Sequence, residues 1–73
     1  MTRKDFIKNF HLTKTKTKCC FYDGRNLKTR SLYIDDKGKF FTIYDFDLYV
    51  VTPVKDNYVD GMERIICRLG CWI

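Results

Sequence analysis

The spacing of apolar residues predicts a short helix at the start of the chain. Within residues 3–11, Phe6 and Phe10 lie four positions apart and therefore share one side of a helix. Thr2 stands where an N-cap belongs, and Asp5 follows at the position that completes a capping box. The opposite side of this helix carries basic residues, so we expect one face to pack and the other to face solvent.

Four segments rich in apolar or alternating residues follow, and turn-forming residues separate them. We predict strands over residues 14–22, 27–34, 39–44 and 48–52. Turns are indicated by Asp23-Gly24, by residues 35–38 and by residues 45–47. Consecutive strands joined by short turns pair antiparallel, so the sequence predicts a four-stranded antiparallel β-meander.

The tail, residues 60–69, fits two different structures. Asp60 and Glu63 have the spacing of a capping box, and Gly70 follows where a helix commonly stops. The same segment alternates between apolar and basic residues, which is typical of a fifth strand, and Ile66 interrupts that alternation. We favour the helix, so the predicted fold is α+β, with an N-terminal helix, a four-stranded antiparallel β-meander and a C-terminal helix or fifth strand.

The size and composition predict one small globular domain over residues 1–73. The chain is 45% hydrophobic and 16% aromatic, which is too apolar for a disordered chain. Its longest apolar runs have the length of strands and fall far short of the roughly 20 residues that span a membrane as a helix. The charged start is unlike a signal peptide, so we expect a cytoplasmic protein that does not enter a membrane.

The net charge of +5 is distributed unevenly along the chain. Residues 1–30 hold nine basic and two acidic side chains, whereas residues 31–60 hold three basic and six acidic ones. A basic region of this kind attracts nucleic acid or an acidic protein surface, although it is also compatible with a solvated face that aids solubility.

The predicted sheet has two apolar faces. One would carry Leu32, Ile34, Phe41, Ile43, Leu48 and Val50, and the other Tyr33, Phe40, Thr42, Tyr44, Tyr49 and Val51. A helix covers one face, so the second requires the other helix, a ligand, a partner or a second copy of the chain in a homodimer. Aromatic residues beside basic ones are also typical of surfaces on which unpaired bases stack.

Residues that could carry chemistry are few. A zinc site formed by His11, one residue of the pair Cys19-Cys20, Cys67 and Cys71 is conceivable, but we favour buried thiols, with either Cys19 or Cys20 facing outward. The paired aspartates occur at turns, where their side chains bond to the backbone. With one histidine and no glycine-rich phosphate loop, we predict no enzyme, no metal and no cofactor.

These observations predict a small, basic, non-enzymatic binding protein. Its composition is typical of the accessory proteins of phages and mobile elements, so we expect a protein-binding module or inhibitor that acts on a protein or nucleoprotein partner. The alternative is direct binding of DNA or RNA by the basic residues 3–30 together with sheet aromatics. The residues predicted to contact the partner or nucleic acid are Arg3, Lys4, Lys8, Lys14, Lys16, Lys18, Lys28, Arg30, Tyr33, Phe40, Tyr44 and Tyr49.

Overall fold

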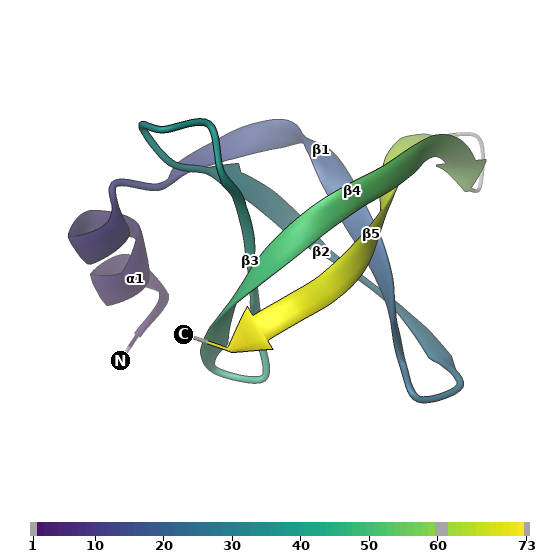
Figure 1. Ribbon diagram of the computed structural model, residues 1–73, viewed down its shortest axis with the longest axis horizontal. Coiled ribbons are helices and arrows are strands. Elements are labelled where there is room, and N and C mark those ends of the chain that lie inside the picture. The colour runs from purple at the N-terminus through teal and green to yellow at the C-terminus, as the bar shows by residue number, and fades with distance from the viewer. Residues whose placement is uncertain (1, 60–61, 73) are drawn as a thin grey trace.

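A computed structural model describes the backbone of residues 2–59 and 62–72 and the side chains of residues 2–54 and 64–70. This part of the chain contains one helix followed by five strands (Figure 1). The elements are α1 (Arg3–Phe10), β1 (Thr13–Asp23), β2 (Asn26–Ile34), β3 (Phe40–Tyr44), β4 (Asp47–Val59) and β5 (Met62–Trp72).

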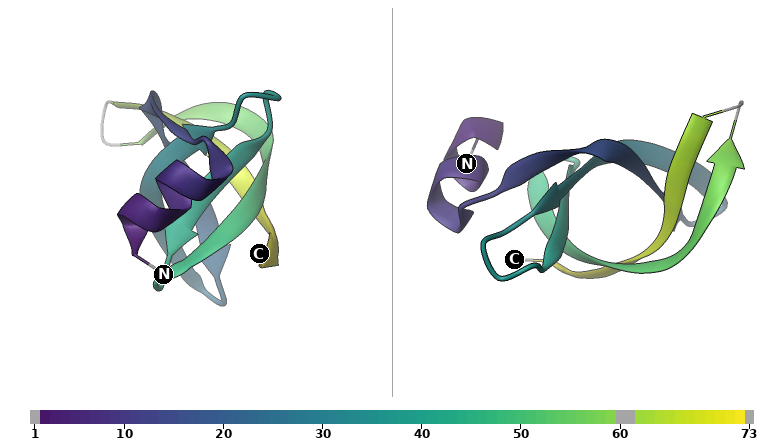
Figure 2. Two further views of the ribbon diagram at one scale, coloured as in Figure 1. Left: turned by 90° about the vertical axis from the view of Figure 1, so that its left-hand side faces the viewer. Right: turned by 90° about the horizontal axis from the view of Figure 1, so that it is seen from above.

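The strands form a closed barrel in the order β1-β2-β3-β4-β5. Each consecutive pair is antiparallel, so the first and last of five strands run in the same direction, and β1 and β5 close the barrel as a parallel pair. The view from above in Figure 2 shows the strands curving into a ring, with α1 outside it on the side of β3. In the part of the chain that the structure describes, every strand therefore has a partner on both sides, although β2 and β3 pair over two residues only.

The N-terminal helix is confirmed, and its cap is the predicted one. The backbone N–H of Thr2 donates to the Asp5 carboxylate at 3.0 Å, and the backbone N–H of Asp5 donates to the Thr2 hydroxyl at 3.3 Å. The hydrogen bonds from Thr2 lower the pKa of Asp5, because they favour its charged form. The helix ends at His11, which takes a left-handed conformation, and its buried residue Phe6 anchors it to the barrel.

Among the residues whose side chains are described, two apolar clusters form the core. One joins α1 to the outer side of β2, β3 and β4, and its buried members are Phe6, Leu12, Tyr33, Phe41 and Leu48. The other fills the barrel with residues from all five strands, and its buried members are Cys19, Phe21, Leu32, Val51 and Cys67. A barrel this narrow leaves its interior to side chains, and two clusters allow a chain of 73 residues to bury apolar surface on both sides of its sheet.

The predicted C-terminal helix is wrong, because residues 62–72 form strand β5. Ile65, Cys67 and Leu69 point into the barrel, in the alternation that the sequence also contained. Ile66, which seemed to interrupt that alternation, is half-buried and pairs with Cys20 of β1. The backbone of this segment forms hydrogen bonds with β1 on one side and β4 on the other. A helix would bond only within itself and would leave both neighbouring strands without this partner. The proposed helix cap at Asp60 lies outside the described residues.

The predicted open four-stranded meander is therefore also wrong, although its strands are close to those observed. The first three strands agree within about two residues at each end, as does the start of β4, but β4 continues past Pro53 to Val59. The register between β4 and β5 shifts between Pro53 and Lys55. Proline is tolerated at such an irregularity, because a β-bulge interrupts the regular ladder of hydrogen bonds.

The predicted division of the sheet faces is wrong for β2. Tyr33 pairs with Phe41, so Tyr33 shares the helix-covered side, while Leu32 points into the barrel beside Phe40. A register difference of one residue exchanges the two faces of a strand, and the loop after β2 sets that register. The second apolar face of the sheet is thus the barrel interior rather than a surface available to a partner.

A β-bulge divides the lysine-rich part of β1. Residues 15–17 lie opposite Leu32 alone, because Lys14 pairs with Tyr33 and Lys18 pairs with Ser31. The Thr15 hydroxyl lies 2.9 Å from the Leu32 carbonyl oxygen and accepts a hydrogen bond from the Thr17 N–H at 3.3 Å. The Thr15 side chain therefore provides hydrogen-bond partners for backbone groups that the interrupted ladder leaves unpaired.

We expect Thr15→Val to lower the free energy of unfolding by about 1–3 kcal/mol, because the variant keeps the side-chain shape but deprives the Leu32 carbonyl of its donor. Urea unfolding followed by circular dichroism measures this change. Thr13→Val is the matched control, since Thr13 is exposed on the same strand. Equal stability of the two variants would show that the bulge does not depend on the Thr15 hydroxyl.

Among the described residues, no helix has the length and apolar character needed to cross a membrane.

Candidate functional site

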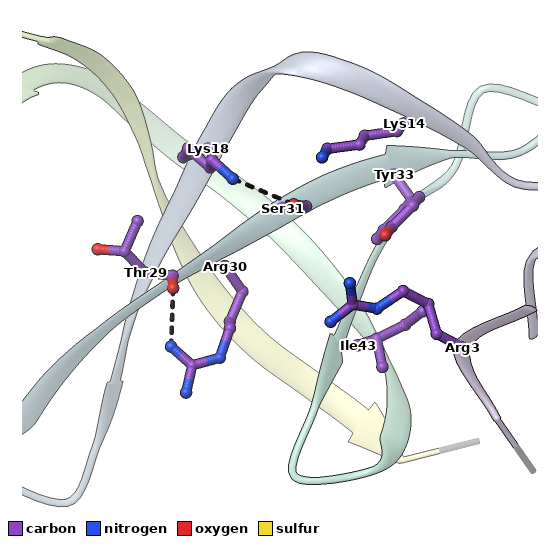
Figure 3. Close-up of a pocket in the computed structure, with 8 residues that line it drawn as sticks. All are labelled: Arg3, Lys14, Lys18, Thr29, Arg30, Ser31, Tyr33 and Ile43. Carbon is purple, nitrogen blue, oxygen red and sulfur yellow. Dashed lines mark hydrogen bonds between the residues drawn. The ribbon is translucent and has the colours of Figure 1, made fainter.

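A pocket of about 260 Å³ lies where α1, β1, β2 and β3 meet (Figure 3). Its lining residues are Arg3, Lys14, Lys18, Thr29, Arg30, Ser31, Tyr33 and Ile43. Four of the eight are basic, three carry hydroxyl groups and none is acidic. This combination of charge and hydrogen-bond donors suits an anionic ligand.

The pocket forms because β2 and β3 separate early. In the described structure their ladder consists of two residue pairs, Tyr33 with Phe41 and Ile34 with Phe40. Beyond these pairs the strands diverge, and the Thr42 hydroxyl spans the gap by donating to the Ser31 carbonyl at 3.0 Å. Figure 3 shows the side chains of β2 and of Ile43 on the two sides of this gap, with Arg3 reaching toward it from α1.

Local contacts hold two of the four cations. The Lys18 ammonium donates to the Ser31 hydroxyl at 3.3 Å, and these residues are paired across β1 and β2. The Arg30 guanidinium donates to the Thr29 carbonyl at 2.8 Å and lies over the ring of Tyr44, 5.1 Å from its centroid. Side chains ordered in this way lose less conformational entropy when a ligand binds.

Tyr44 has a structural role beneath Arg30. Its hydroxyl donates to the Asp23 carboxylate at 2.5 Å, and its ring meets the Phe21 ring edge-on with the centroids 5.1 Å apart. The hydrogen bond to Asp23 raises the pKa of Tyr44, because the carboxylate favours the protonated phenol. These contacts hold the Tyr44 ring in place beneath Arg30. We therefore assign Tyr44 a structural role rather than one in stacking on a ligand.

Alkaline pH should reveal this bond. Since the folded pKa of Tyr44 is raised above the ordinary tyrosine value of 10.0, the contribution of this hydrogen bond to stability is present below pH 10 and is lost as the pH rises through the folded pKa. We expect the melting temperature of the wild type to fall more steeply above pH 10 than that of Tyr44→Phe, which keeps the ring under Arg30 but has no ionisable hydroxyl. Thermal unfolding at neutral and alkaline pH measures the difference, and parallel decreases would contradict it.

The structure brings together five of the twelve residues predicted to contact a partner. Those in the pocket are Arg3, Lys14, Lys18, Arg30 and Tyr33. Lys4 and Lys8 are exposed on α1, and Lys16 is exposed at the bulge. Phe40, Tyr44 and Tyr49 are half-buried, and the first two pack against the barrel core; Lys28 is half-buried opposite Phe21. The basic residues of segment 3–30, here called the basic front, are therefore partly gathered into one site and partly spread over the surface.

Sequence reasoning missed three lining residues: Thr29, Ser31 and Ile43. Nothing in their own pattern distinguishes them from other strand residues. Ser31 becomes significant through its pairing with Lys18, and this pairing depends on the bulge after Lys14. Ser31 could have been identified only if the register between β1 and β2 had been predicted correctly.

The thiols belong to the fold. Cys19 and Cys67 lie in the barrel core, and Cys20 is also fully buried, so the expectation that one of the adjacent pair faces outward is wrong. Cys20 is covered because its sulfur lies 3.5 Å from the Thr29 hydroxyl and its strand neighbour is Ile66. Hydrogen bonding with Cys19, together with burial, raises the pKa of Cys67 and keeps this thiol protonated at neutral pH.

Other candidate ligands are also explained by local structure. No group of three or more metal-binding side chains occurs within the described portion of the chain, and the Cys71 side chain lies outside it. The Asp35 carboxylate accepts from the backbone N–H groups of Lys37 and Lys39 at 3.0 and 2.7 Å, which confirms its predicted turn role.

Comparisons with protein-family models, curated proteins and solved structures found no match for this chain.

Proposed function

We propose that this protein is a non-enzymatic binding protein that holds the phosphate backbone of a nucleic acid in the basic pocket. The observation that carries this proposal is the convergence of Arg3, Lys14, Lys18 and Arg30 from three elements around one cavity. Phosphate oxygens accept hydrogen bonds from guanidinium, ammonium and hydroxyl groups, and all three groups line this pocket.

The charge of the chain supports the same ligand. Exposed lysines on α1 and at the β1 bulge extend the positive potential beyond the pocket. A polyanion contacts several such charges at once, whereas a single small anion is limited to the cavity. Binding should therefore strengthen with oligonucleotide length and weaken with salt.

Fluorescence anisotropy with labelled DNA and RNA, single-stranded and duplex, tests the proposal at low and at physiological salt. We expect the logarithm of the association constant to fall linearly with the logarithm of salt concentration. For single strands the slope should be roughly −2 to −3, which corresponds to three or four neutralised phosphates. Binding that salt does not weaken, or no binding at either salt, would overturn the proposal.

A second candidate function, docking on a protein, is favoured by an exposed apolar patch made of Tyr22, Leu27 and Val54. Tyr22 and Leu27 are paired across β1 and β2. Tyr22 and Val54 line a second cavity of about 310 Å³, together with Arg68. A matching partner would present an apolar side chain next to an acidic one that faces Arg68. If the protein is an inhibitor, as its composition led us to expect, it would bind its target protein through this patch.

Tyr22→Ser separates the two functions. It should leave nucleic-acid binding unchanged, because Tyr22 does not line the basic pocket, and should abolish capture of an acidic protein partner. Light scattering over a range of concentrations tests whether a second copy of the chain, rather than another protein, binds the patch. Concentration-dependent dimers that disappear in Tyr22→Ser would assign the patch to a second copy of the chain.

A further inference from the structure

Phe46 is the most exposed large apolar side chain that the structure describes, with 87% of its surface accessible. It lies in the turn between β3 and β4, where Tyr44 pairs with Asp47 and two residues form the loop. An aromatic ring in this position contributes little to the core and meets solvent on nearly all sides. Single exposed apolar residues are common on protein surfaces, but Phe46 also has a positive φ, which disfavours any residue other than glycine.

The backbone makes phenylalanine a costly choice at this position. Asp45 and Phe46 have φ angles of 52° and 66°, so both central residues of the turn are left-handed. Two-residue hairpin turns of this kind favour glycine at the second central position, because a side chain there is strained. Asp-Gly would form the same turn with less strain and no exposed ring.

Phe46 lies in the turn that directly follows β3, the strand whose residue Ile43 lines the basic pocket. Ile43 of β3 lines the pocket, and Phe46 follows three residues later. At about 3.3 Å per residue the two lie within roughly 10 Å of each other along the chain. Figure 3 shows the strand that carries Ile43 leading into this turn.

Resting on the proposed nucleic-acid function, we propose that the ligand is single-stranded and that Phe46 stacks on one of its bases. A strand whose phosphates occupy the basic pocket passes the turn, where an unpaired base meets the exposed ring. Duplex bases are stacked on one another and present no face to such a side chain, so the geometry selects a single strand. The pocket supplies charge, and Phe46 supplies contact with the base.

Three probes of equal length separate these two contributions: a single-stranded DNA oligonucleotide, the same backbone with abasic sugars, and a duplex. We expect Phe46→Ala to weaken binding of the single strand by roughly 5- to 150-fold, the range for loss of one stacked base. Binding of the abasic strand should be unchanged, because its phosphates still meet the pocket. Phe46→Trp should restore binding of the single strand.

Val54→Ala is the matched control, since Val54 is also exposed and apolar but does not line the basic pocket. It should bind all three probes like the wild type. Equal binding of the three probes by the wild type, or equal losses for the normal and abasic strands in Phe46→Ala, would overturn the stacking role and leave the phosphate pocket intact. Failure of the wild type to bind any probe would overturn the proposed function itself.

Discussion

Exchange of both Lys14 and Arg30 for glutamate is expected to weaken single-stranded nucleic-acid binding by at least about 100-fold at low salt. Each residue lines the pocket, one from β1 and one from β2. A charge-assisted hydrogen bond contributes about 1.5–3 kcal/mol, so loss of two exceeds the roughly 2.8 kcal/mol that corresponds to 100-fold. The salt dependence should also become shallower, by about 0.7 in slope for each lost phosphate contact. Anisotropy titrations over a range of salt concentrations measure both effects.

A variant with the same change in charge tests whether the pocket matters or only the net charge. Lys8 and Lys16 are exposed and do not line the pocket, so exchanging both for glutamate should cost much less affinity. Equal losses in the two double variants would contradict a defined site and favour diffuse attraction to the basic front. Circular dichroism of each variant confirms that the fold is retained, and the glutamine versions of Lys14 and Arg30 repeat the test without charge reversal.

The second large effect is expected at Gly70, where we predict that alanine lowers the free energy of unfolding by about 1–3 kcal/mol. A Cβ atom at this position would lie 2.7 Å from the backbone carbonyl oxygen of Val50. The register of β4 and β5 shifts here, because Tyr49 pairs with Trp72 and Val51 with Leu69, so two residues of β5 face Val50. Backbone cannot withdraw as a flexible side chain can, and the clash must displace one of the strands.

Thermal unfolding measures this cost, which corresponds to a melting temperature lower by roughly 4–8 °C for each kcal/mol in a domain of this size. Gly24→Ala is the comparison, because the space around Gly24 is open and its cost comes only from a φ of 63°. We expect Gly70→Ala to be the less stable of the two. The reverse order would indicate that β4 and β5 do not approach each other closely at the Gly70 bulge.

Features that depend on neighbouring residues were predicted well from the sequence. The capping box of Thr2 and Asp5 forms as expected, because it needs only residues three apart. The turn at Asp35 is likewise stabilised by its own carboxylate. The first strands were located correctly, since their apolar residues and the turn signals between them are also local.

The tail could not be decided in the same way. Its sequence supports a helix and a strand about equally, and the choice depends on partners far away along the chain. Lys18 to Cys20 pair with residues 64–66, and this parallel contact closes the barrel. The alternation within each segment is compatible with a strand, but it does not show which distant segment that strand pairs with. Asp60-Gly61 is a dipeptide typical of two-residue hairpin turns, and this sequence pattern was the available hint.

The sequence alone determined which side chains carry the positive charge, since the net charge follows from composition and its concentration in residues 1–30 follows from residue order. It did not determine which of them act together. The bulge in β1 brings Lys14 and Lys18 to the pocket and leaves Lys16 outside, while closure of the barrel turns the aromatic face inward. Register and closure are properties of paired strands. Only the tertiary structure could therefore convert a basic sequence into a basic pocket.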